Sequence, residues 1–391
     1  MMMSTNETMT FNLPDELTGF RDVTRSFAAE KIAPYAREWD EKKWIPDEVI
    51  AEMGRTGLLG VTMPEEYGGA GQGLLGMTVV VEEIARWCGA TALMIAAHSG
   101  LCSTHIRLAG NDAQKKEWLP KLANGEVIGA WCLSEPECGT DAEALSTRAE
   151  KTSSGWVLNG RKFWITNGQR AGVFVVTART KPERGARTIS AFIVKRDTPG
   201  LIIGEREDKM GMRASDTTPV NLENCEIPEE NLCGELHEGY IDALRVLDRG
   251  RVTIGSLSVG LARGCLEEAV KYAAERQSFG VPLHSHQAIQ LKLADMDTQV
   301  EAARLLVRQA ACTHDAGRPD KQLSSIAKLF ASEMASRVGW ESIQIHGGAG
   351  YTKDVCVERL VRDNKLCEIG EGSSEVQRML IARAECKRHS A

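Results

Sequence analysis

The sequence lacks the features that mark several protein classes. In its 391 residues no apolar run approaches the ~18 residues of a membrane-spanning helix, so we expect no membrane insertion. The start, Met1 to Pro14, has neither an apolar signal pattern nor an Arg-rich amphipathic one, and we expect a cytoplasmic protein. The net charge of −7, with 26% charged residues, gives no support to nucleic acid or an anionic membrane as a partner.

Metal-binding and hydrolytic motifs are absent as well. The eleven cysteines include no Cys-x-x-Cys pair, so neither zinc spacing nor a small disulfide framework is present, and we expect reduced, mostly buried thiols. His284 and His286 come nearest to a ligand pair, but they lack carboxylate or cysteine partners and are expected in a solvated loop. The motifs G-x-S-x-G, H-E-x-x-H and G-x-x-x-x-G-K-[ST] do not occur. We therefore expect no bound metal.

One glycine motif, Gly71 to Gly76, matches the dinucleotide-binding pattern G-x-G-x-x-G. A true fingerprint follows a buried strand and is followed about 20 residues later by an acidic side chain. Here Pro64 to Gly69 precedes the motif, and Ala96 stands at the later position. A glycine loop between helices is the better interpretation.

The periodicity of apolar residues divides the chain into three parts. It is helical with little strand character up to about Gly125, strand-like from Val127 to about Glu226, and helical again after Gly239. We expect an N-terminal helical domain over residues 1–126, a middle β domain over 127–238 and a C-terminal four-helix bundle over 239–391. The fold class is α+β.

The middle part reads as an antiparallel β domain. Short β-rich runs alternate with turn residues, and Asn159-Gly160 predicts a hairpin turn between two of them. Alternation places Trp131, Leu133 and Glu135 on one face of a strand and Cys132 and Ser134 on the other. The expected strands are Trp156 to Leu158, Arg161 to Thr166, Val173 to Thr177 and Ile189 to Val194.

The C-terminal part predicts long packed helices. An apolar stripe from Ile289 to Ala310, with alternating steps of four and three residues, indicates one helix of a bundle. A second stripe from Leu323 to Val338 ends at Gly347-Gly348, and Ala243 to Arg276 supplies an earlier helix. The fourth helix is expected from about Ser374.

Two groups of residues could carry chemistry. Glu371 lies between Gly370 and Gly372 just before a helix, where it is either a catalytic carboxylate or an ordinary solvated one. In the β domain, Trp131 to Pro136, Gly139 to Asp141 and Trp164 to Thr166 offer aromatic, hydroxyl and small residues. These residues suit either a sandwich core or a site for a planar, hydrogen-bonding heterocycle, and spacing alone leaves both interpretations open.

The order of five sequence blocks resembles the flavin-dependent acyl-CoA dehydrogenase family. The resemblance covers the chain from about residue 14 to the end and implies the helical, β-barrel-like and four-helix-bundle architecture, with a homotetramer as the usual assembly. The blocks are Trp131 to Pro136, Phe163 to Gly168, Arg276 to Gly280, Gln344 to Gly348 and Gly370 to Glu375.

The resemblance implies that FAD is the cofactor and assigns residues to it. One group lines the flavin ring and pyrophosphate: Trp131, Leu133, Ser134, Gly139, Thr140, Trp164, Ile165 and Thr166. A second group reaches the FAD of a neighbouring subunit: Arg276, Phe279, Gln287, Gln344, Gly347 and Gly348. Ser373 and Glu375 match positions that touch the adenosine half, although several relatives have Thr and Gln there.

The implied reaction converts an acyl-CoA to its 2,3-enoyl-CoA, with Glu371 as the base for the α-proton. The family's second base position corresponds to Gly250, which cannot act as a base. The expected substrate-contacting residues are Thr140, Asp248, Arg251, Gly370 and Gly372, with a surface ion pair as the alternative for Asp248 and Arg251. The implied electron acceptor is an electron-transferring flavoprotein. Two alternatives are an enoyl-CoA reductase running in reverse and a non-catalytic acyl-CoA-binding member.

The acyl group is less sharply defined by the sequence. The block from Leu247 through Gly350 is most similar to short-chain, butyryl-type members. Gly370 replaces a tyrosine that is common there, which widens the expected pocket and admits branched or cyclic groups. A glutaryl-type enzyme is disfavoured, because Ala90 to Gly100 contains no arginine for a distal carboxylate.

Overall fold

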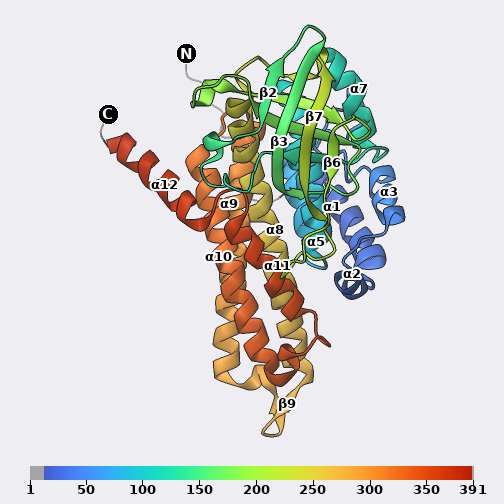
Figure 1. Ribbon diagram of the computed structural model, residues 1–391. Helices are drawn as coiled ribbons and strands as arrows, with labels where there is room; N and C mark the ends of the chain where they lie inside the picture. Colours follow the sequence, from blue (N-terminus) through green and yellow to red (C-terminus); the bar gives the residue numbers. More distant parts are fainter. Residues whose placement is uncertain (1–12, 390–391) are drawn as a thin grey trace.

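The computed structural model describes residues 13–389, so the expectations about the extreme N-terminus lie outside its described part. The middle part forms an eight-stranded sheet. Figure 1 shows this sheet beside the N-terminal helices, and a bundle of long helices that extends well beyond both. The last helix projects away from the body of the molecule (Figure 1).

The N-terminal part is helical, as the sequence predicts. Its α-helices are α1 (Asp15–Phe27), α2 (Ala36–Lys42), α3 (Asp47–Arg55), α4 (Gly73–Ala85), α5 (Gly89–Ile95), α6 (Thr104–Ala109) and α7 (Asp112–Ala123), with π-helical segments η1 (Ala28–Ile32) and η3 (Ala96–Ser103). Because α4 begins at Gly73, the motif from Gly71 to Gly76 spans a loop and the first turn of a helix. A short 3-10 turn, Glu65–Tyr67, precedes the motif where a dinucleotide site would need a strand.

The middle part folds as one sheet with the strand order β6-β7-β3-β2-β4-β5-β8, and β1 pairs with β4. Most pairs are antiparallel, but β1 runs parallel to β4, so the sheet is mixed. The strands are β1 (Gly129–Cys132), β2 (Arg148–Lys151), β3 (Gly155–Thr166), β4 (Val173–Arg179), β5 (Ile189–Lys195), β6 (Leu201–Ile203), β7 (Thr217–Pro228) and β8 (Leu232–Cys233).

The predicted hairpin at Asn159-Gly160 is wrong. Both residues lie inside β3, which continues unbroken to Thr166. The register between β3 and β7 shifts between Leu158 and Gly160, and Gly160 has a φ of 154°. The Asn-Gly pair therefore marks a β-bulge, in which the glycine allows the backbone to kink without ending the strand.

The C-terminal part contains one helix that the sequence did not indicate. Its α-helices are α8 (Gly239–Glu275), α9 (Gln287–Asp315), α10 (Lys321–His346), α11 (Val357–Ile369) and α12 (Ser374–His389), and the small hairpin β9 (Gln277–Ser278) and β10 (Val281–Pro282) joins α8 to α9. The fourth helix of the bundle is α11, which packs against α8 and α10. The prediction that the helix from Ser374 completes the bundle is therefore wrong, because α12 meets α10 and projects outward (Figure 1).

The close packing of α8 against α10 depends on small side chains. Ala327, Ala331 and Ala335 of α10 are buried, and a Cβ on Gly255 of α8 would lie 3.6 Å from the Cα of Lys328. The apolar stripe that predicts α10 includes Leu323 and other half-buried residues, so the helix is turned toward its small residues instead. This rotation carries Lys328 into the interior.

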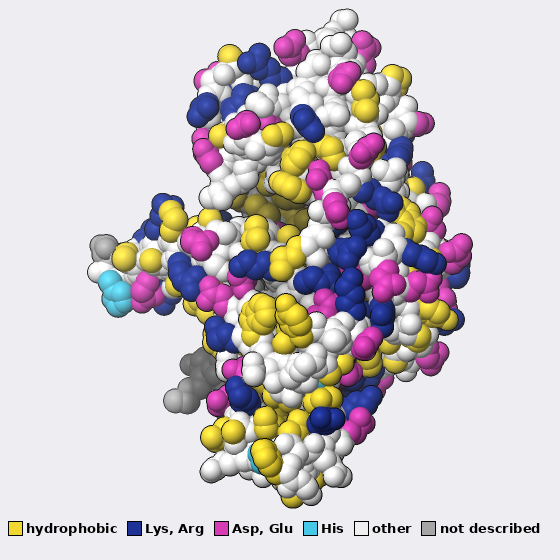
Figure 2. Space-filling view, turned by 60° about the horizontal axis from the view of Figure 1, so that its bottom comes forward, with side chains coloured by type: hydrophobic (Ala, Val, Ile, Leu, Met, Phe, Trp, Pro, Cys, Tyr) yellow, Lys and Arg dark blue, Asp and Glu magenta, His cyan; other side chains and the backbone are white. Residues whose placement is uncertain are grey.

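The surface carries both signs of charge. Figure 2, which brings the far end of the bundle forward, shows acidic and basic side chains intermingled on that face. Eight of the eleven cysteines are buried, as expected for reduced thiols. Within residues 13–389, no helix is both long and apolar enough to cross a membrane, and no cluster of three or more His, Cys, Asp or Glu side chains could hold a metal ion.

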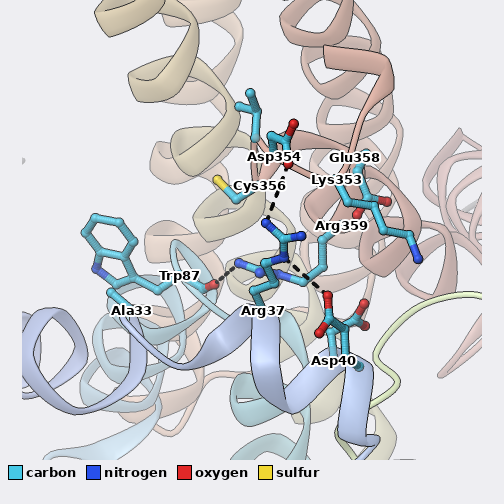
Figure 3. Close-up of a pocket in the computed structure, with 11 residues that line it drawn as sticks. Ala33, Arg37, Asp40, Trp87, Lys353, Asp354, Cys356, Glu358 and Arg359 are labelled. Carbon is cyan, nitrogen blue, oxygen red and sulfur yellow. Dashed lines mark hydrogen bonds and ion pairs between the residues drawn. The ribbon is translucent and has the colours of Figure 1, made fainter. Parts of the chain in front are cut away.

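A small hollow between the N-terminal helices and α11 has a volume of about 170 Å³ (Figure 3). Several of its charged groups are already paired: Arg37 lies 3.8 Å from Asp354, and Nη2 of Arg359 donates to the Trp87 carbonyl at 2.9 Å. None of the residues that the sequence singles out for chemistry lines it. We interpret it as an ion-paired joint between two parts of the fold.

Candidate active site

Glu371 lies in a short turn between α11 and α12 with an unusual backbone. Its φ is 55° and that of Gly372 is 96°, and the left-handed region is costly for a residue with a side chain. Two buried donors hold the carbonyl groups of this turn. Nε2 of Gln377 donates to the carbonyls of Glu371 at 3.3 Å and Gly372 at 2.9 Å, and Nζ of Lys328 donates to the Gly372 carbonyl at 2.8 Å.

The Glu371 carboxyl group is directed at the backbone of α8. A Cβ built on Gly250 would lie only 1.9 Å from its Oε2 atom, so the absence of a side chain there makes room for the carboxyl group. Oε2 is buried and has no hydrogen-bond partner among the described residues. Burial raises the pKa of Glu371 to about 7, although Lys328 and Arg251 act in the opposite direction. A carboxylate in this setting can accept a proton near neutral pH.

Asp248 and Arg251 form a buried ion pair on the same helix, with 2.6 Å between Arg251 Nη1 and Asp248 Oδ1. Both residues are at least 90% buried, so the alternative of a surface ion pair is wrong. Burial raises the pKa of Asp248, although Arg251 beside it acts in the opposite direction. In the described part of the chain no hydrogen bond joins Arg251 to the Glu371 turn, and Nε of Arg251 is buried without a partner.

The structure brings the β-domain residues together where β1 ends beside β3. The Phe163 N–H donates to the Ser134 carbonyl at 2.9 Å, which links the two segments. Trp131 and Leu133 are buried in the same cluster on one face, and Cys132 is buried in the cluster on the other, as alternation predicts. Nε1 of Trp131 donates to Nδ1 of His105 at 3.1 Å, which fixes the orientation of the indole.

Trp164 has a conformation that a strand interior would not produce. Its φ is 61°, it lies at a register shift between β3 and β7, and the residue is 58% exposed. The half-buried Thr166 and Ser134 lie in the joined segments, and a Cβ on Gly139 would meet no atom within 4 Å. An exposed indole, hydroxyl groups and an open glycine segment are what a planar heterocycle with a phosphate tail requires, so these residues fit a flavin nucleotide.

A buried ion pair supports this part of the site from beneath. Nζ of Lys162 lies 2.8 Å from Oε1 of Glu135 and also donates to the Leu133 carbonyl at 3.0 Å. The Glu135 carboxylate in turn accepts the N–H groups of Ser146 and Thr147 at 2.6 and 3.0 Å. Lys162 holds the pKa of Glu135 near 2, although burial acts to raise it. The pair therefore fixes the segment that follows β1.

The second predicted cofactor group lies elsewhere in the chain. The hairpin β9–β10 forms the far tip of the bundle (Figure 1), where Phe279 is 97% exposed with a φ of 52°. The ring of His346, beside Gly347, lies 4.5 Å from that of Tyr272, so the end of α10 lies at this end of the bundle too. The structure does not bring this group together with Trp131 and Trp164 within one chain. Arg276, Gln287, Gln344, Gly347 and Gly348 are likewise exposed.

Four residues that position the site were not predicted from the sequence: His105, Lys162, Lys328 and Gln377. Lys328 and Gln377 are fully buried polar side chains, and both donate to the Glu371 turn. A lysine among the small residues of α10 was the available signal, because lysine is almost never fully buried unless its charge is paired. No comparable signal in the sequence points to His105.

Comparisons with known proteins show the family of this chain. Sequence models of the acyl-CoA dehydrogenase N-terminal, middle and C-terminal domains match residues 14–126, 130–225 and 237–385. The mitochondrial short-chain specific acyl-CoA dehydrogenase of Rattus norvegicus is 43% identical over 370 residues, which is 95% of this chain and 90% of that protein.

Two solved structures extend the likeness to three dimensions. The butyryl-CoA dehydrogenase of Megasphaera elsdenii superposes with a TM-score of 0.95 at 39% identity, covering 97% of this chain and 100% of that one. A glutaryl-CoA dehydrogenase of Mycobacterium smegmatis in complex with FADH2 has a TM-score of 0.91 at 31% identity, covering 97% and 96%. The chain therefore belongs to the acyl-CoA dehydrogenase family of flavoprotein oxidoreductases.

Proposed function

We propose that the protein oxidises a short-chain, branched or cyclic acyl-CoA to the 2,3-enoyl-CoA with FAD as cofactor, and that Glu371 is the catalytic base. The observation that carries the proposal is the Glu371 carboxyl group, whose Oε2 atom is buried without a hydrogen-bond partner and which lies on a strained turn against Gly250. Strain of this kind is typically found at functional sites, where the surrounding structure maintains it.

The proposed chemistry requires Glu371 to take the α-proton of the acyl group. The residues at the end of β1 and in β3 would hold FAD, whose oxidised ring would supply the acceptor for the hydride from the β-carbon. The C–H electron pair at the α-carbon then becomes the new double bond, and the proton remains on the Glu371 carboxyl group. Among residues 13–389, no acceptor takes the Glu371 N–H, so we assign it to the thioester oxygen, where it would stabilise developing negative charge.

The proposed cofactor site consists of the residues at the end of β1 and in β3. Trp131, Ser134, Trp164 and Thr166 would contact the flavin, and the open segment at Gly139 and Thr140 would receive the pyrophosphate. Ser373 and Glu375 lie next to the Glu371 turn and are assigned to the adenosine half. The likeness to a flavoprotein solved with FADH2 supports this assignment.

We further propose that the site is shared between subunits. Arg276, Phe279 and Gln344 lie at the far tip of the bundle, away from the flavin residues of their own chain, so they would contact the FAD of a second copy. A homotetramer, which is typical of the family, provides such contacts. Sedimentation equilibrium of the flavin-loaded protein would test the assembly, and a monomer at micromolar concentration would contradict it.

The proposed acyl pocket is widened by the glycine before Glu371. A Cβ on Gly370 would meet only Leu366, at 3.4 Å and beyond, whereas the space at Gly250 is taken by the Glu371 carboxyl group. The side chain of Leu101 lies 3.1 Å from the Cβ position of Gly250 and makes the pocket apolar there. Branched or cyclic groups near the reacting carbons therefore fit the proposal, as do short linear ones. The likeness to butyryl-CoA dehydrogenase supports a short chain.

The first test is anaerobic titration of the flavin-loaded protein with butyryl-, isobutyryl-, isovaleryl-, hexanoyl-, cyclohexanecarboxyl- and glutaryl-CoA. We expect one or more of the non-glutaryl compounds to bleach the visible flavin band. Glu371→Gln should still bind that acyl-CoA but no longer bleach the band, because the α-proton has no acceptor. Rapid bleaching by the variant would place the base elsewhere.

Two further outcomes would redirect the proposal. A reductase would be indicated if no acyl-CoA reduces the bound flavin but an enoyl-CoA oxidises the bound flavin after it has been reduced chemically. A protein that binds acyl-CoA but cannot be loaded with FAD would indicate a non-catalytic member. We expect the reduced enzyme to pass its electrons to an electron-transferring flavoprotein rather than to O2, which stopped-flow reoxidation with each acceptor would measure.

A further inference from the structure

We propose that Lys328, on α10, is a positioning residue that holds the Glu371 turn in its reactive geometry and places a cation beside the carboxyl group. The inference rests on the proposed function, because it assumes that Glu371 is the base. It concerns a residue that contacts the turn from a different helix.

The first observation is the isolation of the Lys328 side chain. The residue is fully buried, and its ammonium group donates a hydrogen bond to the Gly372 carbonyl at 2.8 Å. Burying an ammonium group is costly unless it is paired, and a single neutral carbonyl compensates only part of that cost. A fully buried lysine in this position therefore indicates a role that an apolar residue could not fill.

The second observation is the strain in the turn that Lys328 holds. Glu371 and Gly372 both have positive φ, and the Gly372 carbonyl accepts from Lys328 on α10 and from Gln377 on α12. Two donors from different helices thus converge on one carbonyl directly after the proposed base. Fixing this peptide fixes the direction in which the Glu371 side chain leaves the backbone.

The third observation is the arrangement of charge around the carboxyl group. The positive charges of Lys328 on α10 and Arg251 on α8 both act to lower the pKa of Glu371. Cys367 and Glu368 of α11 face Lys328. Arg251 is already paired with Asp248. Lys328 has no carboxylate partner within hydrogen-bond distance among the described residues, so its charge is available to Glu371. Burial lowers the pKa of Lys328 to about 8, and a lysine with this pKa is still mainly protonated at neutral pH.

The two donors to Gly372 allow a matched experiment. Lys328→Met removes both the hydrogen bond and the charge, whereas Gln377→Met removes a hydrogen bond to the same carbonyl and leaves the charge in place. Lys365→Met is the control, because Lys365 is an exposed lysine on α11 that pairs with Glu368 and does not touch the turn. Lys328→Gln serves as a second variant should Lys328→Met fail to fold.

Two measurements separate the roles. Hydrogen–deuterium exchange of the peptide spanning 370–377, without acyl-CoA, reports how firmly the turn is held. The pH midpoint of flavin reduction by bound acyl-CoA reports the ionisation of Glu371. We expect both Lys328→Met and Gln377→Met to accelerate exchange, but only Lys328→Met to raise the pH midpoint, by on the order of one unit. Acyl-CoA affinity should change less than the rate of reduction, and Lys365→Met should match the parent protein.

The outcomes distinguish this inference from the proposed function. If Glu371→Gln is inactive and Lys328→Met leaves both the exchange and the pH midpoint unchanged, Lys328 is not a positioning residue, while Glu371 remains the base. If Lys328→Met accelerates exchange but does not move the midpoint, the electrostatic part is wrong. Rapid flavin reduction by Glu371→Gln would overturn the proposed function, and the role of Lys328 with it.

Discussion

The carboxyl group of Glu371 occupies the space that a side chain at Gly250 would need: a Cβ on Gly250 would lie 1.9 Å from Oε2 and 2.8 Å from Cδ of Glu371. The two residues are far apart in sequence, one inside α8 and the other in the turn before α12. The glycine is therefore part of the site, because its missing side chain is what admits the carboxyl group.

Gly250→Ala should separate activity from stability. Alanine favours a helix over glycine by about 1 kcal/mol, yet its methyl group would displace the Glu371 carboxyl group. We expect the rate of flavin reduction to fall roughly 100-fold, as for a catalytic group moved by about 1 Å, while thermal stability is maintained. Stopped-flow spectroscopy and a thermal melt measure the two quantities.

Gly19→Ala is the matched control for that substitution. Gly19 is exposed within α1, and a Cβ there would meet no atom within 4 Å. We expect a small gain in stability and an unchanged rate of flavin reduction. A Gly250→Ala enzyme as fast as the Gly19→Ala enzyme would show that the carboxyl group does not need this space.

The stability of the flavin-free protein should depend on the ionisation of Glu371. Its pKa is about 7 in the folded protein against an ordinary 4.5, so ionisation is disfavoured by folding. The stability associated with this group is fully present below pH 4.5 and is lost as the pH rises toward 7. Glu371→Gln should therefore stabilise the protein by about 3 kcal/mol above pH 7 and by little near pH 4.5.

Urea unfolding of the two proteins at several pH values measures this difference. Glu66→Gln serves as the control, because Glu66 is exposed and makes no hydrogen bond or ion pair among the described residues. A gain in stability that is the same at pH 5 and pH 8 would show that Glu371 is not a raised, buried carboxyl group.

Gly370→Tyr should narrow the acyl pocket. The φ of Gly370 is −68°, which any residue can adopt, and the space around its Cβ is open except for Leu366. We expect the variant to fold, to lose at least tenfold in the rate with isovaleryl-CoA relative to butyryl-CoA, and to keep its flavin. The ratio of the two bleaching rates is the measurement, and an unchanged ratio would place the acyl group away from Gly370.

Breaking the ion pair between Lys162 and Glu135 should destabilise the β domain. Lys162→Met leaves a buried carboxylate without its cation, at a cost of about 3–5 kcal/mol. Adding Glu135→Gln should recover part of this loss, because it removes the unpaired buried charge. The recovery is incomplete, because Ser146 and Thr147 donate their N–H groups to different oxygens of Glu135 and the amide keeps only one of them. Urea unfolding and flavin content after purification measure the effect.

Lys151→Met is the control for Lys162→Met. Lys151 pairs with Glu229 at 2.6 Å on the surface of the same sheet, and a solvated pair of this kind contributes about 1 kcal/mol or less. If Lys162→Met is no more destabilising than Lys151→Met, the buried pair does not support the cofactor segment.

Local sequence patterns were sufficient for most of the fold. The stripe from Ile289 to Ala310 lies inside α9, and the runs ending at Thr177 and Val194 lie in β4 and β5, because the period of apolar residues depends only on how a helix or strand turns. The pattern failed at Gly160, where a turn signal within a long strand became a bulge. It also failed for α11, whose buried Arg359, Asp363 and Asn364 interrupt the apolar period.

The sequence by itself determined that Glu371 lies in a glycine-flanked turn before a helix and that an aromatic and hydroxyl-rich segment lies in the β domain. Only the tertiary structure decided that the carboxyl group rests against Gly250, that Lys328 and Gln377 hold its turn, and that the bundle tip lies apart from the flavin residues. The reason is physical. Sequence patterns report backbone periodicity, whereas the direction and burial of a polar side chain depend on helices that meet only after the chain has folded.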